Sequence, residues 1–270
     1  MLWFLVLLFG LFLKPVYAQD ASVSAKPPTP TPNPAIALFA QYQNDYNYQR
    51  DLYQQAYLEY LNKKNIYTKY GTITTQQEKF DATKKALSAR NNTLRAYLIA
   101  LRVDLDKYRS VNTTETEKFQ IELGKLESWC LEQNLIIDSL NNEEDVKKWI
   151  GDQFVPNFMT IRQATATALV LHENNQILTI LNSLKSLTSD IKLATQNNLT
   201  AQSLLSSMPI KYDLVTISTQ NAYTLTQTKQ YSGNQFNDFY PNAKKEITKA
   251  QGYLVEIQNS LKSLVNKYVN

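Results

Sequence analysis

Apolar residues recur over residues 35–70 at the spacing of a coiled-coil helix. One row of aromatic side chains keeps heptad spacing and consists of Phe39, Tyr46, Tyr53, Tyr60 and Tyr67. A second, mixed row lies three or four residues away and includes Tyr42, Ala56 and Tyr70. A helix with such a stripe must bury it against other elements. The pattern therefore predicts one long helix over Ala35–Tyr70 that packs against later segments of the chain.

Two more helices follow at short intervals. Gly71 is the expected helix terminator, and Thr75-Gln76-Gln77-Glu78 predicts a capping box at the start of the second helix. The stripe of the second helix is Phe80, Leu87, Leu94, Leu98, Leu101, Leu105 and Tyr108. The stripe of the third helix is Phe119, Leu123, Leu126, Cys130, Ile137 and Leu140, interrupted by the polar Gln133. Short connections force antiparallel neighbours, so residues 35–140 are predicted to form a three-helix antiparallel coiled-coil bundle.

Residues 141–270 are predicted to form a second helical segment that packs on the bundle or continues it. Asn142, followed by three acidic residues, is a typical helix N-cap. A helical pattern then runs from Phe158 to about Ser207, with a stripe at Ile177, Ile180, Leu184, Leu187, Ile191 and Ala194. Pro209 starts a helix with Leu214, Ile217, Ala222 and Leu225 on its apolar face, and the last helix carries Ile247, Ala250, Leu254, Ile257, Leu261, Leu264 and Tyr268. No segment alternates as a strand does, so we expect an all-α protein: an elongated antiparallel helical bundle or a set of coiled-coil hairpins, with about six helices and no sheet.

The N-terminal residues predict export. Leu2–Leu13 is an apolar run, too short to span a membrane, and the small-x-small sequence Val16-Tyr17-Ala18 follows it. This pattern indicates a signal peptide over residues 1–18, cleaved after Ala18, and a secreted or extracytoplasmic protein. An uncleaved membrane anchor is the alternative. Residues 19–34 are rich in Pro and Thr and are expected to be a disordered linker.

Composition argues against several functions. The formal charge is +4, and the basic residues occur as isolated pairs with acids nearby, which does not favour nucleic-acid binding. The single cysteine, Cys130, excludes an intramolecular disulfide and is expected to fill space in the core. The only histidine, His172, is expected to be a satisfied interior residue. A single histidine is too few for a His-rich metal site, and no glycine-rich phosphate loop is present, so we predict no catalytic residues, no cofactor-binding residues, no cofactor and no metal site.

Tyrosines are the remaining candidates for a binding site. Tyr48 and Tyr57 lie off the two rows of the first helix, so they are the candidate contact surface for a later helix or a partner, and the alternative is that they are solvent-facing side chains without a partner. The favoured function is an exported, non-catalytic helical-bundle module that binds or scaffolds a protein, a cell-envelope polymer or its own copies. The alternative is a secreted, membrane-active, pore-forming protein that releases Ala164–Leu171. Membrane contact is expected only in that case or through an uncleaved N-terminus. An extracellular enzyme with scattered carboxylates is a third option.

Overall fold

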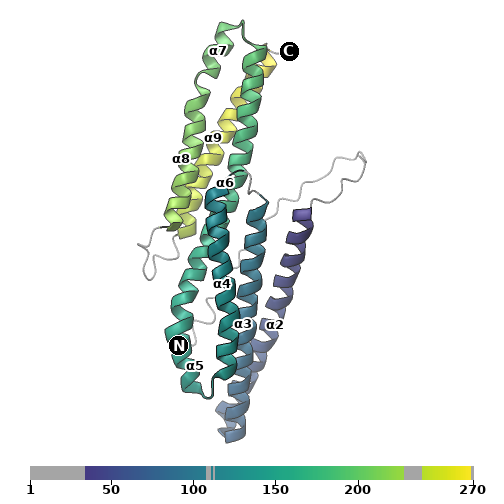
Figure 1. Ribbon diagram of the computed structural model, residues 1–270, viewed down its shortest axis with the longest axis vertical. Helices are drawn as coiled ribbons and strands as arrows, with labels where there is room; N and C mark the ends of the chain where they lie inside the picture. The colour runs from purple at the N-terminus through teal and green to yellow at the C-terminus, as the bar shows by residue number, and fades with distance from the viewer. Residues whose placement is uncertain (1–33, 108–110, 112, 228–238, 269–270) are drawn as a thin grey trace. The chain divides into compact units, whose positions relative to one another are not determined.

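The computed structural model describes residues 34–107, 111, 113–227 and 239–268, and within these ranges every regular element is a helix (Figure 1). The elements are α2 (Pro34–Tyr70), α3 (Ile73–Asp106), α4 (Thr113–Ser139), α5 (Glu143–Trp149), the π-helical turn η2 (Ile150–Phe154), α6 (Val155–Ala194), α7 (Leu199–Leu205), α8 (Met208–Gln227) and α9 (Phe239–Tyr268). Among the described residues, α2, α3, α4, α6, α8 and α9 each have 20 residues or more. The prediction of an all-α bundle with about six helices is therefore confirmed. The predicted signal peptide (residues 1–18) and all but the last residue of the predicted linker (residues 19–34) lie outside the described ranges.

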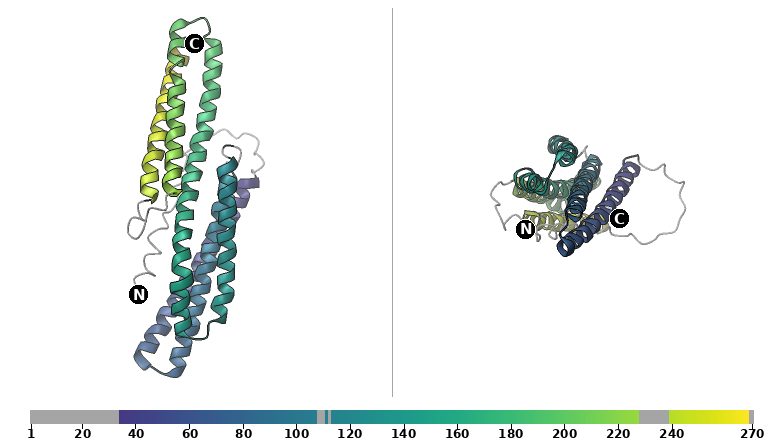
Figure 2. Two further views of the ribbon diagram at one scale, coloured as in Figure 1. Left: turned by 60° about the vertical axis from the view of Figure 1, so that its left-hand side comes forward. Right: turned by 90° about the horizontal axis from the view of Figure 1, so that it is seen from below.

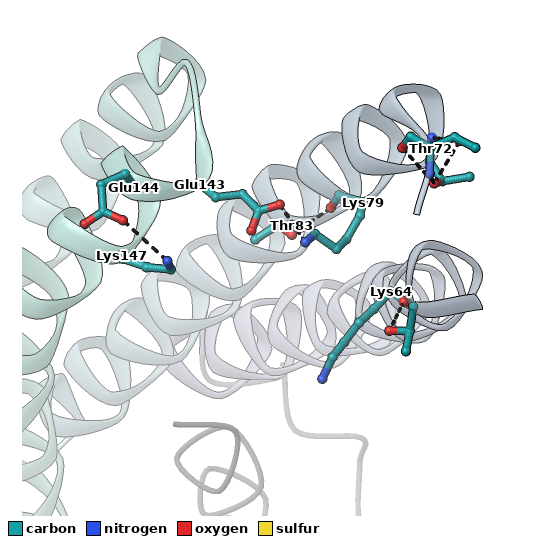
Figure 3. A network of polar contacts seen from close by, with 9 residues as sticks. Lys64, Thr72, Lys79, Thr83, Glu143, Glu144 and Lys147 are labelled. Atoms are coloured by element: carbon teal, nitrogen blue, oxygen red, sulfur yellow. Dashed lines mark hydrogen bonds and ion pairs between the residues drawn. The ribbon is translucent and has the colours of Figure 1, made fainter. Parts of the chain in front are cut away.

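The turn between α2 and α3 forms where the sequence places a glycine before a threonine. Gly71 has a φ of +60°, a left-handed conformation that favours glycine, and its N–H donates to the Tyr67 carbonyl at 2.8 Å. Thr72 is the N-cap of α3: its hydroxyl accepts from the N–H of Thr75 at 3.2 Å, and the Thr75 hydroxyl accepts from the N–H of Thr72 at 3.1 Å (Figure 3). The predicted capping box at Thr75–Glu78 was wrong by three residues, because Thr72 satisfies the same donors directly after the turn.

α3 lies between α2 and α4, and both pack against it (Figures 1 and 2). Among the described helices, α2 packs extensively against α3 alone, and only Tyr53 and Ala56 of α2 become buried. α6 covers α3 and α4 on another side. The first core cluster therefore combines residues before and after Leu140, from Phe80 on α3 to Leu171 on α6.

A second core cluster is formed by α6, α8 and α9 together with α7. It contains Ile177 and Leu181 of α6, Val215 of α8 and Ile257 of α9. The 40 residues of α6 thus line both clusters. Buried amides mark the position where α6 changes partners. Asn175 donates to the Thr116 hydroxyl of α4 at 3.3 Å, and Asn174 donates to the Thr219 carbonyl of α8 at 2.8 Å.

Two expectations for the C-terminal half need correction. The helix predicted to continue to Ser207 ends at Ala194, because Asn198 caps a separate helix, α7, by accepting from the N–H of Ala201 at 3.0 Å. The apolar stripes also extend beyond the buried faces. Ile180 and Leu187 of α6 and Leu214 and Ile217 of α8 are exposed, because three helices cover only part of each stripe.

Candidate functional site

The structure separates the two tyrosines that were predicted as one contact surface. Tyr48 has 63% of its side chain exposed on the outer face of α2. Tyr57 is half-buried, and its ring centroid lies 6.1 Å from that of Tyr53 and 6.0 Å from that of Tyr60. Tyr57 therefore belongs to the row of aromatic rings along α2, whereas Tyr48 is available to a partner.

A groove begins on α2 at Leu52, one helical turn after Tyr48. It runs along α2 and α3, has a volume of about 670 Å³, and is called the α2–α3 groove below. Eleven residues line it: Leu52, Gln55, Ala56 and Glu59 from α2, Asp81, Lys84, Lys85, Ser88, Ala89 and Asn92 from α3, and Asp138 from α4. It forms because α2 and α4 flank α3 without packing extensively against each other, so one side of α3 stays open.

Polar contacts fix the walls of the groove. Lys85 pairs with Glu59 at 2.6 Å and joins α3 to α2. Lys84 donates to the carbonyl oxygens of Asp138 at 2.6 Å and Leu140 at 2.9 Å, where the C-terminal carbonyls of α4 lack helical partners. The Oγ of Ser88 is buried and has no hydrogen-bond partner among the described residues. The groove thus has charges of both signs held in place at its walls.

Leu52, Ala56 and Ala89 give the groove apolar wall positions at helical spacing. A surface of small and aliphatic side chains with charges at its edges matches the needs of an amphipathic helix, which buries an apolar stripe and keeps its polar flanks in water. The groove contains carboxylates, amines and a hydroxyl but no imidazole or thiol. Among the described residues, no group of three or more His, Cys, Asp or Glu side chains is arranged to hold a metal ion. Docking of another molecule is what this arrangement supports.

A second polar cluster connects α3 with α6. The Asp104 carboxylate lies 2.5 Å from Nδ1 of His172 and accepts from Lys107 Nζ at 2.7 Å. Nε2 of His172 lies 2.9 Å from the amide nitrogen of Gln176. Burial raises the pKa of Asp104, but the hydrogen bonds and charges of His172 and Lys107 outweigh that effect and hold the pKa below its usual value. Both ring nitrogens of His172 therefore have protein partners, as expected for a histidine that joins two helices.

The core also contains a buried cation. Arg90 of α3 is 5% exposed, and its guanidinium carbon lies 3.5 Å from the ring centroid of Phe154 and 6.0 Å from that of Trp149. Its Nε and Nη2 have no hydrogen-bond partner in the described part of the chain. Burial lowers the pKa of Arg90 to about 10. The ring faces of Phe154 and Trp149 provide the attraction that replaces an acidic partner.

Two residues of α4 near Arg90, Gln133 and Cys130, were discussed in the sequence analysis, and both are buried. Gln133, which interrupts the stripe of α4, is buried and accepts from Nε1 of Trp149 at 2.8 Å. Cys130 is buried in the first core cluster as predicted, and burial raises the pKa of its thiol to about 12. The hydrogen bond between Gln133 and Trp149 joins α4 to α5.

The residues of the α2–α3 groove, other than Ala56, were not singled out from the sequence. Lys85, Ser88 and Asn92 recur at three- and four-residue spacing on α3, which is the available signal that they share a face. The sequence does not show that this face stays open, because that depends on how far α2 and α4 lie apart.

Comparison of the chain with protein-family models, with curated proteins and with solved structures found no match. Any functional proposal must therefore rest on the sequence and on the geometry described above.

Proposed function

We propose that the protein is an exported, non-catalytic helical-bundle module that binds or scaffolds another molecule outside the cytoplasm. The observation that supports this most directly is the α2–α3 groove beside the exposed Tyr48, with apolar wall positions and charges fixed by Lys84 and Lys85. A protein that presents an amphipathic helix is the partner that fits this surface best. A cell-envelope polymer is the second partner class, since an exposed tyrosine ring can stack on a sugar.

Export is the part of the proposal that rests on sequence alone, because residues 1–18 lie outside the described ranges. Its test is N-terminal sequencing of the chain produced by its own cells. A mature chain in the extracytoplasmic fraction that begins at Gln19 is the expected result. A chain recovered from the cytoplasm with Met1–Ala18 still attached would contradict both the export and the proposed site of action.

Site-specific photo-crosslinking tests the binding surface. A benzophenone amino acid replaces Tyr48 in one variant and Tyr70 in a matched control, since the two tyrosines lie on the same helix with 63% and 60% exposure. After irradiation in intact cells, we expect a discrete adduct from position 48 and none from position 70. Leu52→Glu adds a fourth acid to the groove, which already contains Glu59, Asp81 and Asp138, and it should abolish the adduct at position 48. Equal adducts from positions 48 and 70 would show that the groove is not the binding surface.

The membrane-active alternative predicts leakage of dye-loaded liposomes. Its candidate segment, Ala164–Leu171, lies within α6, where Ala164, Ala168 and Leu171 belong to the first core cluster. No described helix combines the length and apolar character needed to cross a membrane. Dye release together with flotation of the protein with lipid would replace the binding-module proposal with this alternative.

A further inference from the structure

The outer face of α4 carries an apolar row in addition to its buried stripe. Its members alternate by three and four residues, and they are Ile121, Gly124, Ser128, Leu131 and Leu135. The three large members are well exposed: Ile121 by 62%, Leu131 by 50% and Leu135 by 71%. Their spacing is that of the a and d positions of a coiled coil. α4 therefore presents a second seam that no described helix covers.

The middle of this seam is a notch. A Cβ atom added at Gly124 would meet nothing within 4 Å, so the space above the glycine is open. Ser128 satisfies its own hydroxyl, which donates to the Gly124 carbonyl at 3.1 Å. Covering either residue therefore leaves no side-chain polar group without a hydrogen-bond partner. A large apolar side chain from another helix could rest on either position.

We propose that the occupant of this seam is a second copy of the chain, with the two α4 helices antiparallel about a twofold axis. In an antiparallel coiled coil, an a position of one helix faces a d position of the other. Leu135 then lies over Gly124 of the second copy, and Leu131 lies over Ser128 of the second copy. Leu131 and Leu135 each cover a small residue of the other helix, so this part of the surface is complementary to itself, as a twofold interface requires.

The charges beside the seam favour the same orientation. Lys125 and Glu132 are exposed, and neither has an ion pair in the described part of the chain. The antiparallel alignment places Lys125 beside Glu132 of the second copy, and the symmetry repeats this pair. A parallel alignment would instead set Gly124 against Gly124 of the second copy and would not bring Lys125 beside Glu132 of the second copy. That alignment leaves the notch empty and forms neither ion pair.

The dimer is expected to be weak. The seam covers residues 121–135 of a single helix, about 22 Å of length at 1.5 Å per residue. An interface of this size falls below the standard size of stable complexes, so we expect a dissociation constant in the micromolar range. The proposal concerns a different surface from the α2–α3 groove, and it stands or falls independently of the proposed binding function.

Sedimentation velocity of the purified protein, from about 1 to 300 µM, is the first test. We expect a monomer–dimer equilibrium that Leu135→Glu weakens by at least about 10-fold. The matched control is Leu193→Glu on α6, because Leu193 is also 71% exposed. It should dimerise like the wild type. A monomer at every concentration, or equal loss in both variants, would overturn the proposal.

Charge reversal tests the orientation. Lys125→Glu and Glu132→Lys should each weaken the dimer, since each creates two like-charge pairs in the antiparallel alignment. The double variant should regain wild-type dimerisation, because it restores both pairs with their signs exchanged. Both residues are exposed, so circular dichroism should show the same helical content in all variants. Failure of the double variant to recover would overturn the antiparallel alignment.

Discussion

Replacing Arg90 with methionine should stabilise the protein, because the folded state buries this charge and no acidic residue in the described ranges pairs with it. Burial lowers the pKa of Arg90 from 12.5 to about 10. At about 1.4 kcal/mol per pKa unit, this shift corresponds to a desolvation cost of about 3 kcal/mol at neutral pH. The contact between the guanidinium and the Phe154 ring, 3.5 Å from its centroid, returns about 1–2 kcal/mol. Methionine is unbranched and packs well against aromatic rings, so Arg90→Met should gain about 1–2 kcal/mol.

The assay is urea unfolding followed by circular dichroism at neutral pH, supported by a thermal melt. A gain of this size should raise Tm by a few degrees. The matched control is Arg102→Met, because Arg102 holds the nearly buried Glu127 at 2.8 Å. That variant leaves an uncompensated carboxylate and should lose about 2 kcal/mol. A loss of 1 kcal/mol or more in Arg90→Met would refute the reasoning, since it would mean that the guanidinium has an acceptor in the folded protein.

Three further predictions concern the core and the polar cluster. Asp104 has a lowered pKa in the folded protein, so its stabilisation is present above its unfolded pKa of about 3.8 and is lost as the pH falls below that value. Asp104→Asn should therefore show a smaller decrease of unfolding free energy between pH 5 and about 2 than the wild type, as measured by urea titrations. The Cys130 thiol should not react with Ellman's reagent at pH 8 in the native protein, and it should react fully in guanidinium chloride, because it is buried with a pKa of about 12. Leu98→Ala should cost about 2–5 kcal/mol in urea unfolding, because Leu98 is fully buried in the first core cluster, and a cost below 1 kcal/mol would contradict that packing.

The helices were predictable because their signals are local and repeated. The aromatic row of α2 has five members at heptad spacing, and no strand pattern competes with it. The error at the start of α3 has a specific cause. Thr72 and Thr75 form a reciprocal cap as effectively as Thr75 and Glu78 would, and the position of Gly71 decides between them.

The candidate site depends on distances that the sequence does not contain. The α2–α3 groove combines residues from Leu52 to Asp138, and it exists because α4 does not close over α2. The exposure of Tyr48 and the half-burial of Tyr57 depend on how α3 packs against α2. Periodicity identified the aromatic row, but it did not show which neighbouring face would stay open.

The length of α6 has a mechanical consequence. One helix of 40 residues lines both core clusters, so a tensile load applied to one cluster reaches the other through an unbroken series of backbone hydrogen bonds. Because the same helix packs in both clusters, pulling α6 out of one cluster also strains its packing in the other. Under force, the described bundle should therefore rupture in one event rather than two.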